Sequence, residues 1–140
     1  MFLKGIISLI RWWIYWLFRL GAVVAPTLTA KAGVGIFTRP SSSRDFLEDL
    51  NLSRQSRSSF LNFEGGQLAM MEWGEGPIVL GVHGWNSSGK RFRHFIKPLV
   101  DSGFRLVVFD GPAHGCSSGS HLDLIQYARS IVAIARRMGT

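Results

Sequence analysis

The chain has 140 residues, 46% of them apolar, which is enough for one modest domain with a hydrophobic core and excludes a largely disordered chain. Its single cysteine, Cys116, excludes an internal disulfide, and no spaced set of Cys and His residues indicates zinc, so no metal and no other cofactor is expected. The net charge of +7 is unevenly distributed along the chain. Residues 1–44 hold six Lys and Arg and no acidic residue, whereas residues 45–140 hold ten Lys and Arg and nine Asp and Glu. This asymmetry predicts a basic, membrane-associating segment joined to a nearly neutral domain.

The first predicted element is an apolar N-terminal helix, MFLKGIISLIRWWIYWLFRLGAVVAP, inside a helical segment that covers residues 1–39. On a helical wheel its basic stripe fits within an arc of about 80°, and the stripe consists of Lys4, Ser8, Arg11, Tyr15 and Arg19. A narrow basic stripe on a broad apolar helix is typical of a helix that lies in the membrane surface. We therefore expect residues 1–25 to contact anionic lipid and the protein to be membrane-associated, facing the cytoplasm.

Three other interpretations of this segment remain open. A spanning helix needs about 20 apolar residues, and an Arg near its centre costs about 2.5–3.5 kcal/mol on insertion scales. A secretory signal peptide ending at residues 30–32 would export the protein, although Arg19 interrupts its apolar region. An organellar transit peptide is basic and poor in acidic residues, as this segment is, but the five aromatic residues in 12–18 are excessive for one.

The segment that follows, residues 40–58, is predicted to be a polar linker with a short helix near Asp45–Leu50. Folded structure is expected over residues 59–140. It begins with two short strands, 59–63 and 67–73, which a Glu-Gly-Gly turn joins as a hairpin. The unbroken apolar runs 78–82 and 105–110 predict two strands that are covered on both faces.

Two helices are predicted to alternate with the later strands. The first covers about Lys90–Asp101 and has a core stripe of Phe92, Phe95, Ile96 and Leu99. Its basic face, with Lys90, Arg93 and Lys97, is interpreted as solvated, so nucleic acid is not an expected partner. The final helix has the stripe Tyr127, Ile131, Ile134 and Met138, and Ser120 with Asp123 resembles a capping box at its start. Strand–helix–strand–helix order predicts an α/β fold, in which parallel strands with crossover helices follow the hairpin.

Two motifs in this region resemble the α/β-hydrolase fold family. IVLGVHGW at residues 78–85 matches a strand followed by His-Gly-x, and FDGPAHGCS at residues 109–117 matches Asp-x-Pro-Gly-His-Gly-x-Ser, with Ala113 in place of the usual Gly. The resemblance covers about residues 60–140. It implies a partial α/β-hydrolase sheet with strand order 1-2-4-3-5, and a serine hydrolase that cleaves an ester, thioester or amide substrate by acyl transfer.

Residues 115–119, Gly-Cys-Ser-Ser-Gly, also match G-x-S-x-G, the signature of a serine nucleophile. Such a nucleophile sits on a tight turn directly between a strand end and a helix start. Here the strand ends near Asp110 and residues 111–115 intervene before Ser117, so we interpret the match as coincidental. The motif residues are then a structural loop, whose members are Asp110, Pro112, His114, Gly115 and Ser117.

The resemblance implies one catalytic element in this chain, the backbone N–H of Trp85 as an oxyanion-hole donor, with His83 and Gly84 shaping its turn. No triad can be assembled, because the family carries its nucleophile, acid and histidine later in the chain than His83, His94, His114 and His121. The chain is therefore expected to be the N-terminal half of a hydrolase, poorly soluble and inactive alone. A non-enzymatic membrane-bound interaction module and an Asp-nucleophile enzyme, as in epoxide hydrolases and dehalogenases, remain alternatives.

Overall fold

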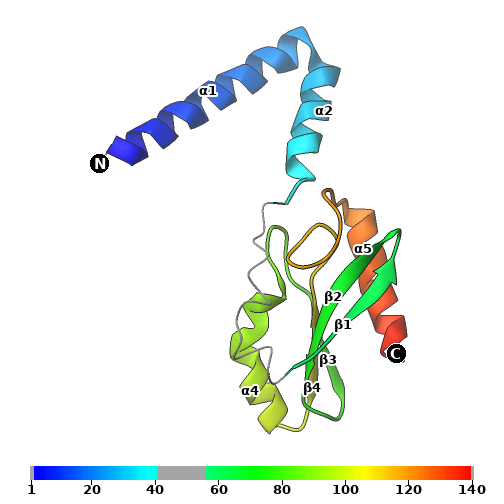
Figure 1. Cartoon of the computed structure of the whole chain (residues 1–140). Helices are drawn as coiled ribbons and strands as arrows, with labels where there is room; N and C mark the ends of the chain where they lie inside the picture. Colours follow the sequence, from blue (N-terminus) through cyan, green and yellow to red (C-terminus); the bar gives the residue numbers. More distant parts are fainter. Residues whose placement is uncertain (1, 41–55, 140) are drawn as a thin grey trace. The chain divides into compact units, whose positions relative to one another are not determined.

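A computed structural model describes residues 2–40 and 56–139, so the short helix expected near Asp45–Leu50 lies outside the described residues. The chain divides into two compact units, Met1–Thr38 and Arg39–Thr140. The described part of the first unit is helical, and the second unit contains a β-sheet with helices (Figure 1).

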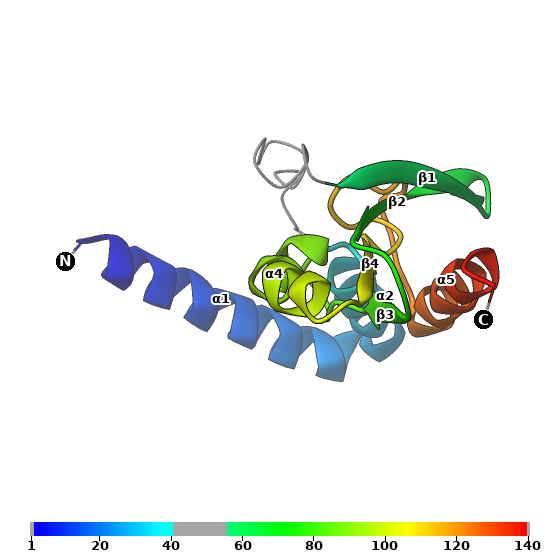
Figure 2. The ribbon, with the colours of Figure 1, turned by 90° about the horizontal axis from the view of Figure 1, so that it is seen from below.

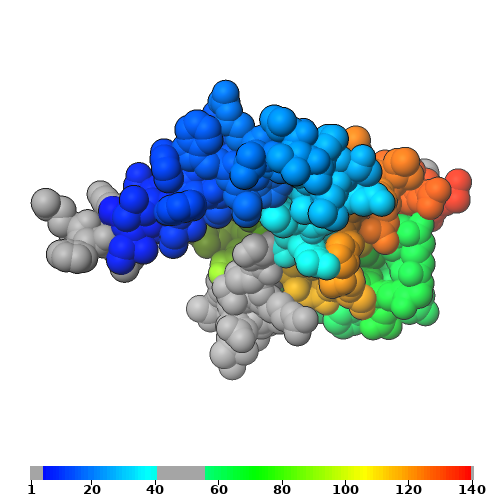
Figure 3. All heavy atoms as spheres, turned by 90° about the horizontal axis from the view of Figure 1, so that it is seen from above, coloured from blue at the N-terminus to red at the C-terminus, as the bar shows by residue number. Residues whose placement is uncertain are grey.

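The helical unit consists of α1 (Phe2–Val24) and α2 (Pro26–Phe37), which meet at an elbow (Figure 1). The break falls at Pro26 because proline lacks the N–H that would continue the helix, while its fixed φ suits the first turn of a new one. Over Gly5–Val24, α1 is long and apolar enough to cross a membrane, with a mean hydropathy of 1.3. Most of its large apolar side chains that the structure describes are exposed. Figure 3 shows the surface of this unit in blue to cyan.

The sheet of the second unit has the order β1-β2-β4-β3. Its strands are β1 (Arg57–Phe63), β2 (Gly66–Trp73), β3 (Ile78–Gly81) and β4 (Arg105–Phe109). The pairs β1–β2 and β2–β4 are antiparallel and β3–β4 is parallel, which confirms the predicted α/β class and its initial hairpin. β1 begins inside the residues predicted to be linker, because Arg57 pairs with Glu72 across the hairpin and forms an ion pair with Glu75.

The helix predicted at Lys90–Asp101 is divided into a 3₁₀ turn, η1 (Gly89–Phe92), and the α-helix α4 (Arg93–Asp101). A 3₁₀ turn has about three residues per turn, so the side chains no longer keep the register of one continuous α-helix. Phe95, predicted to lie in the core, is consequently 57% exposed. Val100 packs instead against the buried cluster, together with Phe92 and Leu99.

The final helix, α5 (Leu124–Arg137), begins at a different cap from the predicted one. Asp123 is the N-cap residue, and its Oδ1 accepts a hydrogen bond of 2.7 Å from the backbone N–H of Gln126. The Ser120 capping box is therefore wrong. The carboxylate satisfies one of the N–H groups that have no partner within the helix, and its charge is favourable at a helix N-terminus.

α4 and α5 cover opposite faces of the sheet (Figure 2). Because successive side chains of a strand point to opposite faces, Leu106 and Val108 of β4 pack toward α4, whereas Val107 and Phe109 pack toward α5. All four of these side chains are fully buried. β4 is therefore covered on both faces, as its unbroken apolar run predicted.

Candidate functional site

The predicted site residues all follow the carboxyl ends of two parallel strands, β3 and β4. Residues 82–88 leave β3 and residues 110–123 leave β4, and both loops lie at the same end of the sheet (Figure 1). The carboxyl end of a parallel sheet is where α/β proteins place their ligand sites. The hydrogen bonds between these two loops define what the site can do.

Asp110 joins the two loops through its buried carboxylate, since the residue is only 1% exposed. Its Oδ1 accepts a hydrogen bond of 2.8 Å from the backbone N–H of Gly89, in the segment after β3. Its Oδ2 accepts one of 2.9 Å from the backbone N–H of Cys116, in the loop after β4. A buried carboxylate needs such donors to offset its desolvation, so Asp110 serves as the centre of the scaffold.

Ser117 is held on β2 by both functions of its hydroxyl. Its Oγ donates to the carbonyl oxygen of Asp110 and accepts a 2.8 Å hydrogen bond from the backbone N–H of Ala69. A nucleophilic serine instead donates its proton to a general base such as histidine. The geometry thus supports the interpretation that the G-x-S-x-G match is coincidental.

A serine–histidine contact does occur at Ser120, whose Oγ lies 2.9 Å from Nδ1 of His121. The Nε2 of this histidine accepts a hydrogen bond from the guanidinium of Arg39, where a triad has a carboxylate to orient and stabilise the imidazolium. This contact therefore lacks the electrostatics of a catalytic dyad.

His83 and His114 hold the loop backbones with both of their ring nitrogens. The Nε2 of His83 accepts from the N–H of Gly111 at 2.9 Å, so its Nδ1 donates to the carbonyl of Gly84. His114 uses the same tautomer: its Nε2 accepts from Asn86 at 3.1 Å, and its Nδ1 donates to the carbonyl of Pro112. Burial lowers the pKa of His114, which keeps this ring neutral.

Three positions of the loop after β4 have a positive φ, namely Ala113, Gly115 and Gly119. Gly115 has a φ of 48°, and a Cβ atom there would lie 2.0 Å from Oδ2 of Asp110, so only glycine fits. Ala113 has a φ of 60°, which explains why the resembled family usually has glycine at this position. The departure noted in the sequence therefore adds backbone strain at Ala113.

The turn after β3 presents Trp85 beside an open position. The indole of Trp85 is 41% exposed and packs edge-to-face on the ring of His114, with 5.7 Å between ring centroids. No described heavy atom outside its chain neighbours lies within 4 Å of an ideal Cβ on Gly84. The turn thus has room for a ligand atom near the backbone of Gly84. His114 holds the turn in place, because its ring accepts a hydrogen bond from the backbone N–H of Asn86.

Tyr127 of α5 is a site residue that the sequence analysis assigned only to a core stripe. Its hydroxyl donates a hydrogen bond to the carbonyl oxygen of His83, and its ring lies against Gly111. Burial, with a smaller contribution from the charge of Asp110, raises its pKa to about 12. The sequence did contain a signal for this role. A tyrosine in an apolar helix stripe is expected to be buried, and a buried phenol usually has a hydrogen-bond partner.

No family model matches the chain. The non-heme chloroperoxidase CPO-A1 of Kitasatospora aureofaciens is 33% identical over 55 residues, which cover 39% of this chain and 20% of that protein. The serine hydrolase-like protein of Homo sapiens is 35% identical over 75 residues, which cover 52% of this chain and 36% of that protein. The chain therefore spans about a third or less of the length of these relatives.

Two solved structures resemble the fold. A thioesterase domain from the curacin biosynthetic pathway has a TM-score of 0.53 at 30% identity, over 59% of this chain and 33% of that one. The epoxide hydrolase VrEH1 from Vigna radiata has a TM-score of 0.57 at 25% identity, over 62% of this chain and 30% of that one. Both similarities cover less than two thirds of this chain.

Proposed function

Because the chain belongs to the α/β-hydrolase fold family over part of that fold, we propose that it forms part of a hydrolase that cleaves an ester, thioester or amide by acyl transfer. The observation that carries this proposal is the hydrogen-bonded turn after β3. His83 donates a hydrogen bond to the carbonyl of Gly84, while His114 and Asp110 accept hydrogen bonds from the backbone N–H groups of Asn86 and Gly89. Preorganised backbone of this kind is what an oxyanion hole requires.

In this proposal the backbone N–H of Trp85 stabilises the negative charge that develops on the substrate's carbonyl oxygen. Gly84 lets that oxygen approach, since the space beside it is open. The exposed indole of Trp85 then contacts the acyl or leaving group. The nucleophile comes from another part of the protein than the loop after β4, because the hydroxyl of Ser117 already bonds Asp110 and Ala69.

The helical unit attaches this hydrolase to a membrane. Support comes from the length and apolar surface of α1, which suit either a spanning helix or one in the membrane surface. Residues 1–44 contain no acidic residue that would oppose contact with an anionic lipid surface. The cytoplasmic side is the expected location of the hydrolase unit.

Replacement of Trp85 tests the catalytic part of this proposal. The substitutions are introduced into the gene in its natural host, and the protein that the host produces is purified. Trp85→Pro removes the backbone N–H, so we expect kcat on p-nitrophenyl esters or acyl thioesters to fall about 100-fold or more, with a smaller change in KM. Trp85→Phe keeps the N–H and is the matched control, with kcat within a few-fold of wild type. Circular dichroism checks that both variants fold. Equal kcat values for the two variants would reject Trp85 as an oxyanion donor.

A carboxylate nucleophile is the second candidate, favoured by the likeness to an epoxide hydrolase structure. Such an enzyme would form an ester between its Asp and the substrate carbon, which water then hydrolyses. Incubation with an epoxide in H₂¹⁸O distinguishes the two chemistries, because only a carboxylate nucleophile incorporates ¹⁸O into an Asp side chain. Fluorophosphonate labelling of a serine would instead support the first proposal.

A further inference from the structure

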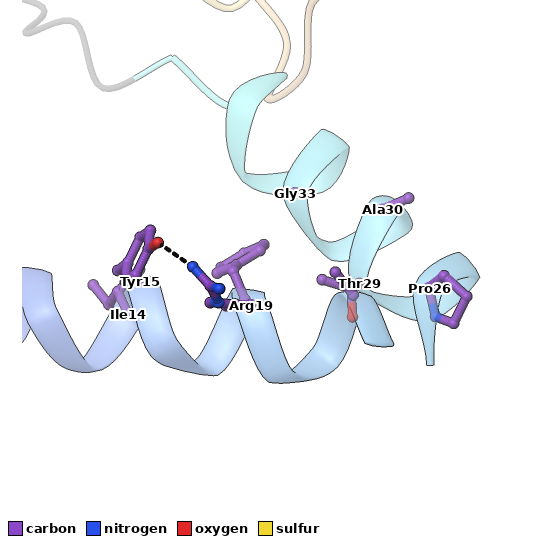
Figure 4. A pocket seen from close by; sticks show the side chains of 9 residues that line it. Ile14, Tyr15, Arg19, Pro26, Thr29, Ala30 and Gly33 are labelled. Carbon is purple, nitrogen blue, oxygen red and sulfur yellow. Dashed lines mark hydrogen bonds between the residues drawn. The ribbon is translucent and has the colours of Figure 1, made fainter. Parts of the chain in front are cut away.

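The inner side of the elbow between α1 and α2 is a crevice of about 600 Å³ (Figure 4). It is open to one side, and its walls are mostly apolar. The lining residues come from both helices, with Ile14, Phe18 and Ala22 on α1, and Pro26, Ala30 and Gly33 on α2. Tyr15, Arg19 and Thr29 supply its polar groups.

The crevice results from the close approach of two helices that diverge from Pro26. Next to the elbow the helices touch, since a Cβ on Gly21 would lie 2.5 Å from Oγ1 of Thr29. One turn farther along α2, Gly33 faces the ring of Phe18, and a Cβ on this glycine would lie 3.5 Å from that ring. The small residues therefore leave a slot of apolar walls that none of the described side chains fills.

Arg19 places one positive charge at this slot (Figure 4). Its Nη1 donates to the hydroxyl of Tyr15 at 2.9 Å, and its guanidinium carbon lies 5.4 Å from the ring centroid of Trp16. These contacts orient the group and use one of the five N–H donors of a guanidinium. No acidic residue precedes Asp45 in the sequence, so the charge is not neutralised from within this unit.

We infer that the crevice is a binding site for one anionic phospholipid, with its phosphate on the guanidinium of Arg19 and an acyl chain in the slot. An apolar slot beside an oriented arginine matches both parts of such a molecule, because arginine pairs bidentately with phosphate oxygens. This inference rests on the membrane attachment proposed above. It goes beyond that attachment, because a basic stripe binds a charged membrane surface by diffuse attraction and needs no site for a single lipid.

Vesicle sedimentation of the whole chain tests the charge. We expect tighter binding to phosphatidylcholine vesicles containing 30% phosphatidylglycerol than to pure phosphatidylcholine. Arg19→Gln should weaken binding to the mixed vesicles about tenfold, as expected for a charge-assisted contact. Arg11→Gln removes the same charge outside the crevice. Its affinity for the mixed vesicles should fall by less than about fivefold, as expected for one diffuse contact with the charged surface.

Native mass spectrometry from phosphatidylglycerol-doped detergent tests the slot. Wild type should retain one phosphatidylglycerol. Gly33→Leu fills the slot and should retain none. Gly35→Leu, on the same helix, adds the same side chain where no described atom outside its chain neighbours and the nearby backbone of its own helix lies within 4 Å of the Cβ, and it should retain the lipid.

Four outcomes would overturn the site. They are equal losses for Arg19→Gln and Arg11→Gln, lipid retention by Gly33→Leu, lipid loss by Gly35→Leu, and a protein dimer in place of the lipid complex. Vesicle binding that persists in any of these cases leaves the proposed membrane attachment intact. Failure of the wild-type chain to bind either kind of vesicle would instead reject the attachment and the site with it.

Discussion

At the scale of single residues, the site depends on a glycine that makes room for a buried carboxylate. Gly115→Ala would place a methyl group 2.0 Å from Oδ2 of Asp110, at a φ of 48° that also strains alanine. Left-handed backbone alone costs a non-glycine residue about 1–2 kcal/mol. Displacing the carboxylate from the N–H groups of Gly89 and Cys116 adds the loss of two charge-assisted hydrogen bonds. We expect the free energy of unfolding to fall by about 3 kcal/mol or more.

Urea titration of the chain in mild detergent measures this effect, and Gly65→Ala is the matched control. Gly65 has a φ of 78° in the β1–β2 turn, but no described atom outside its neighbours lies within 4 Å of its Cβ position. Its substitution should therefore cost only the backbone strain, about 1–2 kcal/mol. Equal losses of unfolding free energy for Gly115→Ala and Gly65→Ala would show that a methyl group at position 115 does not displace the carboxylate of Asp110.

His114 makes the stability of the same loop dependent on pH. Burial lowers its pKa in the folded chain below the ordinary value of 6.5, so the unfolded chain binds the extra proton first as the pH falls. The stabilisation is complete above about pH 6.5 and is lost as the pH decreases toward the folded pKa. Urea midpoints at pH 7.5 and 5.5 should show this loss in wild type and a smaller one in His114→Gln.

A wild-type pH response in His114→Gln would contradict the assignment of the response to the buried ring.

At the scale of elements, α5 tests which residue begins a helix. Asp123→Ala removes the acceptor for the N–H of Gln126 and a favourable charge at the helix N-terminus. The expected loss is about 1 kcal/mol of unfolding free energy. Ser120→Ala should change it by less than about 0.5 kcal/mol, as surface substitutions do. A larger loss in Ser120→Ala than in Asp123→Ala, measured by urea titration, would restore the capping box expected from the sequence.

The elements themselves were largely predictable because their signals are local. The apolar run that became β4 shows no polar alternation, and β4 is covered on both faces as this pattern predicts. The same prediction for β3 holds only in part, because Ile78, Val79 and Leu80 are half-buried on a strand at the edge of the described sheet. Phe95 was misplaced because the 3₁₀ turn before α4 changes the register of the stripe, and no pattern in the sequence specifies that turn. Pro26 did mark the break between α1 and α2, although the sequence interpretation treated the segment as one unit.

The motif residues of the loop after β4 could be named from the sequence, whereas their contacts could not. Motif resemblance identified Asp110, His114 and Ser117 as one loop. Their partners Gly89, Asn86 and Ala69 lie 21 to 48 residues away along the chain, and only the packing of the strands brings them together. Tyr127 was missed for the same reason, since its bond to the carbonyl of His83 spans 44 residues.

At the scale of the whole molecule, we propose a membrane-binding helical unit joined to an α/β unit that supplies the oxyanion side of a hydrolase site. This proposal requires that the serine in G-x-S-x-G supports the loop after β4 instead of attacking a substrate. Both functions of the Ser117 hydroxyl are used within the fold, by Asp110 and by Ala69. An attacking serine would have to give up these bonds.

The most direct test is to treat the folded chain with a fluorophosphonate and map the modified residues by mass spectrometry. We expect Ser117 to remain unmodified. In Ser117→Ala the free energy of unfolding should fall by about 1–3 kcal/mol, because the buried N–H of Ala69 loses its acceptor. A stoichiometric fluorophosphonate adduct on Ser117 would contradict the account.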